Sequence, residues 1–177
     1  SKNVQAIRED EVIEMAAAAG LPLVGENRQA DKTTTYGVGQ LMAHAAKRGV
    51  EKMVVGLGGS STNDGGTGAA AALGVKFYNS KGESFVPVGA TLKDIARIDT
   101  SGLMPEITSD IDNPLCGPHG AAAVFGPQKG ADPEMVKRLD AGLCHMAEIV
   151  KRDIGAEILD LPGSGAAGGM GGGMVAY

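Results

Sequence analysis

Short apolar runs alternate with segments of helical spacing along the chain. Residues 50–55 and 75–78 have the length and the apolar content of buried strands. Residues 33–49 and 132–155 instead place apolar side chains three or four positions apart, as an amphipathic helix does. This alternation predicts an α/β fold with a mainly parallel sheet and flanking helices.

The clearest predicted helix runs from Asp132 to about Arg152. Asp132 can cap the first turn, and Pro133 suits the first helical position because proline lacks the N–H that would be unpaired there. Gly155 is suited to ending the helix. One apolar stripe at helical spacing should face the core, and its members are Val136, Leu139, Leu143, Met146 and Val150. We therefore expect this helix to be structural.

The remaining elements are short. Residues 11–19 begin like a strand and become alanine-rich, so both strand and helix stay open. Residues 79–82 read as a tight turn between 75–78 and 84–86, which predicts a β-hairpin insertion. Two more helices are predicted at 69–73 and 91–96, and two more strands at 107–109 and 158–161.

Composition is typical of a globular protein and excludes some partners. The 177 residues, 43% of them hydrophobic and 21% charged, suffice for one domain with a core. A net charge of −5 without a Lys/Arg cluster argues against nucleic-acid binding. No apolar run approaches the roughly 18 residues of a membrane span, and the first ten residues lack a signal-peptide core. We therefore expect a cytoplasmic protein with no membrane partner, and reduced thiols at Cys116 and Cys144.

The most informative segment for function is residues 53–68, MVVGLGGSSTNDGGTG. An apolar run leads there into a loop of Gly, Ser, Thr, Asn and Asp, and a small-residue helix follows. Backbone N–H groups of such a loop can converge on an anion. A polar turn without a ligand is the alternative. The candidate phosphate- or substrate-binding residues are Gly58, Gly59, Ser60, Ser61, Thr62 and Asn63.

Neither standard nucleotide-binding motif is complete in this loop. Ser61 stands where G-x-G-x-x-G needs its third glycine, and the Gly-Lys-Ser/Thr of a Walker A loop is missing. Residues 163–168, GSGAAG, do match G-x-G-x-x-G, which makes Gly165 and Gly168 further binding candidates and keeps a nicotinamide-dependent oxidoreductase open. However, Pro162 breaks the preceding strand, which favours a turn before a tightly packed small-residue helix.

Acidic residues and one lysine complete the candidate chemistry. Asp110, Asp112 and Asn113 follow a strand candidate, and carboxylate and amide oxygens there can hold Mg²⁺. An Asx turn before Pro114 is the alternative. Lys129, in a loop bounded by Gly and Pro, can neutralise phosphate charge, although lysines in loops are more often solvated.

Three long segments together resemble the bacterial-type glycerate kinase family. They are residues 54–74, 110–131 and 163–173, and they follow the family's order. The resemblance implies Mg²⁺- and ATP-dependent phosphorylation of D-glycerate, giving 2-phosphoglycerate. Family members are longer, so it also implies that residues 1–177 form one α/β region of a two-domain kinase. A homodimer stays open, because the sequence does not address the oligomeric state.

For such a kinase we expect the 58–63 loop to cradle phosphate or the glycerate carboxylate. Asp110 is the first candidate for general base or Mg²⁺ ligand, and Asp64 is the second candidate base. Lys129 offsets charge on the transferred phosphoryl group, and Asn113 orients substrate or metal. A fragment that binds an anion or a nucleotide without catalysis is the alternative reading.

Overall fold

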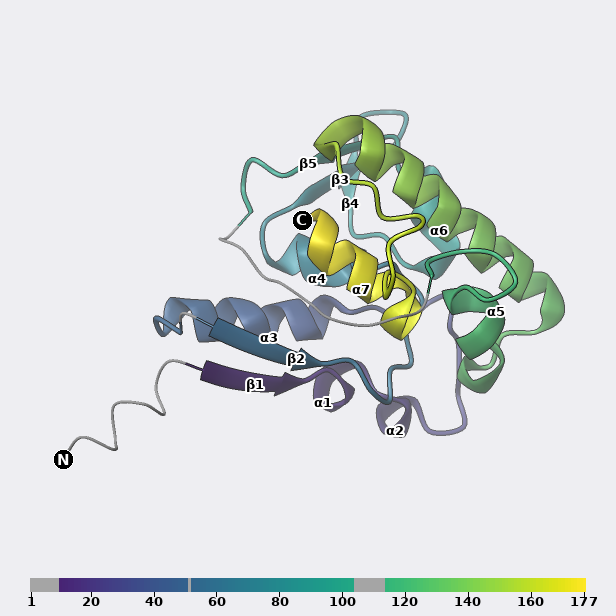
Figure 1. Cartoon of the computed structure of the whole chain (residues 1–177), viewed down its shortest axis with the longest axis horizontal. Coiled ribbons are helices and arrows are strands. Elements are labelled where there is room, and N and C mark those ends of the chain that lie inside the picture. Colours follow the sequence, from purple (N-terminus) through teal and green to yellow (C-terminus); the bar gives the residue numbers. More distant parts are fainter. Residues whose placement is uncertain (1–9, 51, 104–113) are drawn as a thin grey trace.

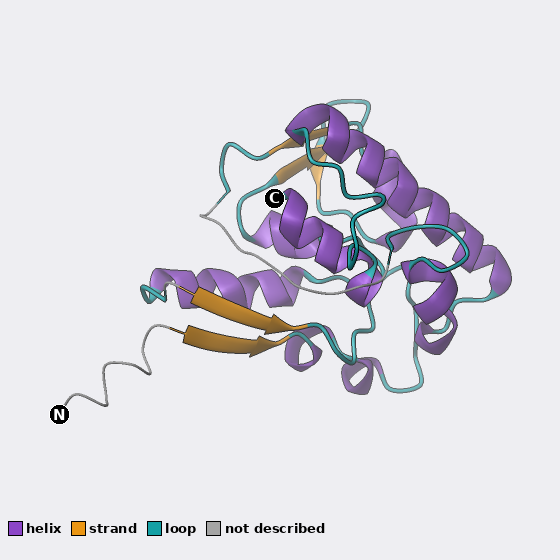
Figure 2. Cartoon of the chain, in the orientation of Figure 1, coloured by secondary structure: helices purple, strands orange, loops and turns teal. Residues whose placement is uncertain are grey.

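A parallel pair of strands forms the first of two small sheets (Figures 1 and 2). The computed structural model describes residues 10–50, 52–103 and 114–177. Strand β1 (Asp10–Glu14) runs parallel to β2 (Lys52–Gly56), with Val12 opposite Val54. Residues 11–19, which the sequence left open, thus begin as a strand and continue as α1 (Ala16–Ala19).

Three helices connect the parallel strands, as the alternating pattern predicts. Helix α1 is followed by α2 (Leu21–Val24) and α3 (Tyr36–Lys47). Helix α3 contacts both β1 and α4 (Thr67–Ala72), the alanine-rich helix that follows the loop after β2. The buried members of this first core are Ile13, Met15, Ala19, Val38, Met42, Ala45, Ala69, Leu73 and Met170. The fold therefore places the glycine-rich loop between β2 and two packed helices.

The second sheet is antiparallel and contains the predicted hairpin. Its strand order is β4 (Ser84–Phe85), β3 (Lys76–Tyr78) and β5 (Arg97–Asp99). The Asn79 side chain holds the hairpin turn, since its Oδ1 accepts 3.0 Å hydrogen bonds from the N–H groups of Lys81 and Glu83. The α/β class and the hairpin insertion are thus confirmed, and the parallel pairing among the described residues is that of β1 with β2.

The long helix α6 (Pro133–Ile154) packs against the antiparallel sheet and the short helix η1 (Gly89–Asp94). Its predicted cap is confirmed, because the N–H of Met135 donates to Asp132 Oδ1 at 2.7 Å. Gly155 ends the helix with a φ of +82°. The largest side chains of this second core are Phe77, Leu92, Ile95, Leu115, Leu139, Leu143, Met146 and Ile158. Val136 is half-buried at its edge.

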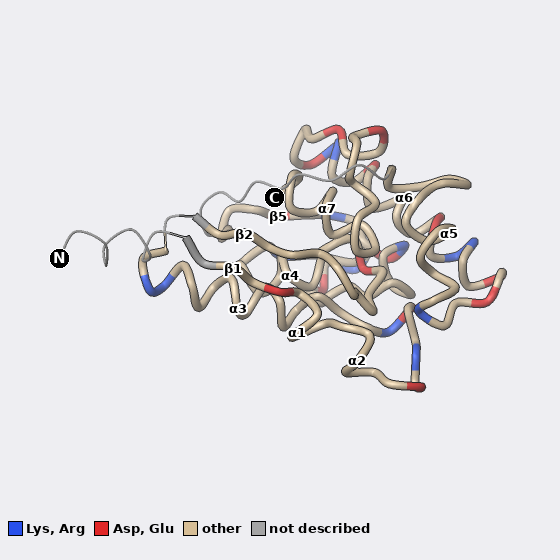
Figure 3. Tube along the Cα trace, turned by 60° about the horizontal axis from the view of Figure 1, so that its bottom comes forward, with Lys and Arg blue, Asp and Glu red and all other residues tan. Residues whose placement is uncertain are grey.

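The C-terminal part departs from one prediction and agrees with another. Residues 158–161 form a loop rather than a strand: Ile158 is buried in the core, Leu159 is exposed, and among the described strands none pairs with this stretch. The glycine-rich segment 163–173 is a turn that leads into a small-residue helix, because Ala167, Gly168 and Gly169 have φ values of +53°, +75° and +92° and regular helix follows them within α7 (Ala166–Ala176). Helix α7 packs against α4 and α5 (Ala121–Phe125). Helices α4 and α7 carry no charged residue (Figure 3), and their small side chains allow this close packing.

Two further helices begin at other residues than expected, and one strand candidate falls outside the described residues. The helix expected at 91–96 is the 3₁₀ helix η1, which begins two residues earlier because Thr91 Oγ1 accepts from the N–H of Val88 at 2.9 Å. Helix α3 begins after Thr35, whose side chain does not cap it. The strand candidate at 107–109 lies outside the described residues.

Candidate anion-binding site

The two glycine-rich segments, residues 57–66 and 163–169, lie against each other. The N–H of Gly65 donates to the carbonyl oxygen of Gly168 at 2.9 Å. Ser60 Oγ donates to the carbonyl oxygen of Ala167, 107 positions further along the chain, at 3.4 Å. Gly168 has a φ of +75°, and a Cβ there would collide with the carbonyl oxygen of Thr62. The contact between the segments therefore requires glycine at this position.

Lys129 reaches into this contact from the short helix η2 (Pro127–Lys129). Its side chain is buried, with 2% of the residue surface exposed. The ammonium donates to Ser60 Oγ at 3.3 Å and to the carbonyl oxygen of Thr62. An ammonium has three N–H bonds. Within the described residues these two oxygens are its acceptors, so one N–H stays available for a ligand.

A cavity of about 310 Å³ opens beside the Lys129 ammonium. Its walls come from the loop after β2, from α5 and η2, and from the first turn of α7. A few polar groups in a largely apolar lining, at this volume, suit a small ligand, since ligand cavities start at roughly 300 Å³. The lining residues are Leu57, Gly58, Gly59, Ser60, Phe125, Gln128, Lys129, Ala166 and Ala167.

Burial sets the electrostatic character of this cavity. Removal from water lowers the pKa of Lys129 from its ordinary value to about 8, and the negative charge of Asp64 opposes that shift. A buried charge is costly unless a partner of opposite sign compensates it. The charged form of Lys129 would therefore gain from an anion in the cavity. The site favours an anionic ligand over a neutral one.

Asp64 lies deeper than the cavity and is fully buried. Its Oδ2 accepts from the N–H and the hydroxyl of Thr35 at 2.7 and 2.9 Å, and its Oδ1 accepts from the N–H of Gly66 at 3.2 Å. Burial raises the pKa of Asp64, while these hydrogen bonds act to lower it. Thr35 Oγ1 also accepts from the N–H of Ala69 at 2.8 Å. Asp64 thereby joins the starts of α3 and α4 beneath the loop.

Of the other predicted side chains in the loop, two form hydrogen bonds within the protein and one is buried without a partner among the described residues. Ser61 faces α1, because its Oγ and its N–H both donate to the carbonyl oxygen of Ala19 at 2.9 Å. Thr62 Oγ1 shares a 3.0 Å hydrogen bond with Ser60 Oγ. Asn63 is fully buried, and neither polar atom of its amide has a partner among the described residues. An unpaired buried amide is costly and suits a group that gains its partner from a ligand or a water molecule.

The predicted metal site cannot be placed in the same way. Asp110, Asp112 and Asn113 lie outside the described residues. Within the described ranges, no group of three or more His, Cys, Asp or Glu side chains could hold a metal ion. The Mg²⁺ ligands therefore stay a prediction. Gly165 is buried immediately before α7, and it is not one of the residues that line the cavity at Lys129.

Sequence reasoning missed part of the site. Phe125 and Gln128 line the cavity with Lys129, and the short spacing of these three residues along α5 and η2 was the signal that could have found them. Thr35, which binds Asp64 through its N–H and its hydroxyl, was also not among the predicted site residues. The predicted nucleotide turn at 163–168 has no strand before it among the described residues, which weakens the oxidoreductase reading.

Comparison with known proteins identifies relatives of the whole described region. The model of the glycerate kinase family matches residues 2–177. A glycerate kinase from Haemophilus influenzae is 52% identical over 172 residues, which is 93% of this chain and 46% of that protein. A glycerate 2-kinase from Escherichia coli is 43% identical over 173 residues, covering 93% of this chain and 45% of that protein.

A solved structure extends this likeness to the fold. The crystal structure of a protein described as a glycerate kinase 2, from Salmonella typhimurium LT2, matches with a TM-score of 0.90 and 46% identity. The match covers 96% of this chain and 47% of that one. The chain thus spans about half the length of the relatives it matches. In the described part of the chain, no helix has the length and apolar content needed to cross a bilayer.

Proposed function

The chain belongs to the glycerate kinase family, and we propose that it forms part of an enzyme that transfers the terminal phosphoryl group of ATP to D-glycerate. The relatives named glycerate kinase and glycerate 2-kinase support this substrate, and the second name supports 2-phosphoglycerate as the product. The observation that carries the proposal is the buried Lys129 ammonium beside a small cavity, with one N–H that has no acceptor among the described residues. A cytoplasmic location and a homodimer remain predictions.

Lys129 is the residue we assign to charge neutralisation. Phosphoryl transfer depends mainly on positioning and on stabilising charge at the transferred group. A buried ammonium acts strongly there because little water screens it, and Ser60 and Thr62 already fix its position. ATP supplies the phosphoryl group when bound. The exposed backbone of Gly58 and Gly59, at the cavity wall, can approach a phosphate or carboxylate oxygen closely.

We propose a positioning role, not a base role, for Asp64. Both of its oxygens already accept hydrogen bonds from Thr35 and Gly66, and its side chain has no exposed surface. A general base must reach the proton it removes. Asp110 therefore remains our candidate for base or Mg²⁺ ligand, with Asp112 as the second predicted ligand. Replacement Asp110→Asn should abolish turnover without unfolding the protein.

A domain that binds an anion or nucleotide without catalysis is the second candidate. The observation that favours it is that the described part of the site offers an anion the Lys129 ammonium and the exposed backbone of Gly58 and Gly59, while Asp64 is occupied by hydrogen bonds. Binding alone stabilises a folded protein whether or not chemistry follows. A rise in melting temperature with ATP, without ADP release, would support this candidate for the 177 residues alone.

The deciding experiment is a coupled ADP-release assay on the full-length gene product. ATP and Mg²⁺ are supplied with and without D-glycerate, and the phosphorylated product is identified by ³¹P NMR. The proposal expects ADP release that depends on D-glycerate, and 2-phosphoglycerate as the product. A folded protein that releases no ADP would refute it, and 3-phosphoglycerate would refute the product assignment alone.

A further inference from the structure

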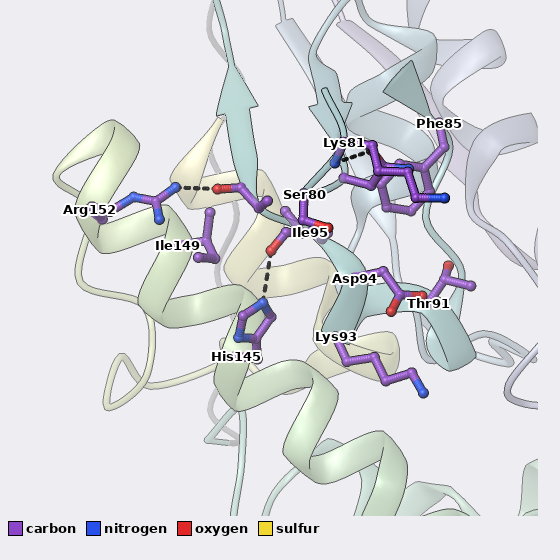
Figure 4. Close-up of a pocket in the computed structure, with 12 residues that line it drawn as sticks. Ser80, Lys81, Phe85, Thr91, Lys93, Asp94, Ile95, His145, Ile149 and Arg152 are labelled. Carbon is purple, nitrogen blue, oxygen red and sulfur yellow. Dashed lines mark hydrogen bonds between the residues drawn. The ribbon is translucent and has the colours of Figure 1, made fainter. Parts of the chain in front are cut away.

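A second and larger cavity lies between the β3–β4 hairpin, η1 and the C-terminal half of α6 (Figure 4). Its volume is about 710 Å³, and none of its lining residues borders the cavity at Lys129. His145, Ile149 and Arg152 of α6 line this cavity, whereas no residue of α6 lines the cavity at Lys129. The cleft is therefore independent of the proposed kinase site.

The charges that line the cleft are mostly positive, although the whole chain has a net charge of −5. The cations are Lys81, Lys93 and Arg152, and Asp94 is the one acidic residue in the lining. Arg152 already bonds to Asp153 at 2.6 and 2.9 Å and to the carbonyl oxygen of Ala96 at 2.6 Å. Lys81 and Lys93 are exposed, and neither ammonium forms an ion pair within the described part of the chain.

The floor of the cleft is apolar and its walls are fixed. Ile95 and Ile149 are buried, and Phe85 is half-buried beside them. His145 Nε2 lies 2.8 Å from the carbonyl oxygen of Ile95, which ties α6 to the chain entering β5 (Figure 4). The hydrogen bond from Arg152 to the carbonyl oxygen of Ala96 connects the same two segments one residue further along the chain. A cavity with fixed walls costs a ligand little ordering of the protein.

We propose that this cleft binds a phosphate monoester that carries an apolar body. Lys81 from the hairpin turn and Lys93 from η1 bring to this cleft two ammonium groups without an ion pair among the described residues (Figure 4). Two such groups suit a dianion, whereas one would serve a carboxylate. The apolar body would cover Phe85, Ile95 and Ile149, and the volume lies within the roughly 300–1,000 Å³ of small-molecule sites. Lys81 and Lys93 are the residues that select the anion.

Phenyl phosphate is a suitable probe because it joins one ring to one dianion. Binding is measured by a ¹H–¹⁵N NMR titration of the protein, beside titrations with inorganic phosphate and with phenol. The proposal expects saturable shifts at Lys81, Lys93 and His145 for phenyl phosphate, and weaker binding of both partial probes. Absence of saturable binding, or equal affinity for inorganic phosphate, would overturn it.

Matched charge variants locate the binding. The double variant Lys81→Gln/Lys93→Gln should weaken phenyl phosphate binding by roughly tenfold or more, because hydrogen bonds to charged groups are lost. The control Lys137→Gln/Lys151→Gln removes the same charge from two exposed lysines that pair with Glu134 and Glu157, and it should change affinity less than about twofold. Equal losses in both variants would indicate general attraction between charges and refute the site.

Discussion

Glycine has a different structural role in each of the two glycine-rich segments. In residues 57–66, glycine stands beside polar side chains, which hold the buried Lys129 and connect α3 with α4. In residues 163–173, glycine lets a left-handed turn pack directly against that first loop, and a helix follows the turn within α7. The second segment matches the dinucleotide pattern better, yet the first provides the polar wall of the cavity. A glycine pattern alone thus indicates that two backbone segments approach closely. The polar residues beside the glycines indicate whether the segment can bind a ligand.

Replacing Lys129 should have the largest effect, because it removes the charged group at the first segment and leaves the backbone packing of the second unchanged. In the variant Lys129→Met we expect kcat/KM for D-glycerate phosphorylation to fall by about 10²–10³, roughly 3–4 kcal/mol, because the charge at the transferred group is lost. Far-ultraviolet circular dichroism should show the helices intact. Lys137→Met, on the exposed surface of α6, is the control and should keep wild-type activity. Activity within about threefold of wild type would contradict the role given to Lys129.

Adding one methyl group to the second segment should test its packing. We expect Gly168→Ala to lower the free energy of unfolding by about 3 kcal/mol, since it combines a positive φ with a collision against Thr62. Gly155→Ala is the matched control: its φ is +82° but a Cβ there meets open space, so about 1 kcal/mol is expected. Chemical denaturation measures both. Equal losses would mean that the backbone conformation, and not the contact, requires Gly168.

The elements that could be predicted are those whose signal is local. The cap at Asp132, the stripe of α6 and the turn at Asn79 each depend on residues within one helix or one turn. The strand expected at 158–161 could not be judged in this way, because a strand also needs a hydrogen-bonding neighbour, and the fold provides none among the described strands. The helix that follows the left-handed residues 167–169 within α7 likewise packs against α4 and α5 despite the low intrinsic helix propensity of its glycines.

The candidate site shows the same limit. The loop at 58–63 and Lys129 could be selected from the sequence because glycine, hydroxyl groups and a lysine have recognisable chemistry. The sequence could not show that Ser61 would face Ala19. It also could not show that both carboxylate oxygens of Asp64 would accept hydrogen bonds from Thr35 and Gly66. Those partners are distant along the chain, so only the fold decides which side chains face the cavity.

The variant Asp64→Asn should weaken the connection that Asp64 makes between α3 and α4. Its effect on stability should be smaller than that of Gly168→Ala. We expect a loss of about 2 kcal/mol in the free energy of unfolding, because an amide N–H₂ would face N–H and hydroxyl donors of Thr35 and Gly66. Asp132→Asn is the control, since asparagine caps a helix about as well as aspartate. Thermal unfolding of both variants provides the comparison. A stable Asp64→Asn protein without kinase activity would instead support a direct catalytic role for Asp64.

The smallest effect should come from titrating Lys129, and it moves stability and activity in opposite directions. The pKa of Lys129 is lowered to about 8 in the folded state, so between pH 8 and the ordinary lysine value the unfolded chain binds more protons. This group's contribution to the free energy of unfolding therefore rises with pH through that window. Activity that needs the ammonium should fall instead, by about tenfold for each pH unit above 8, or roughly 1.4 kcal/mol.

A profile of kcat/KM from pH 6.5 to 9.5 for wild type and Lys129→Arg is the measurement, because arginine stays charged throughout this range. The descending limb near pH 8 should be present in wild type and missing in any residual activity of the arginine variant; an identical limb in both would assign it to another group and leave Lys129 without an electrostatic role.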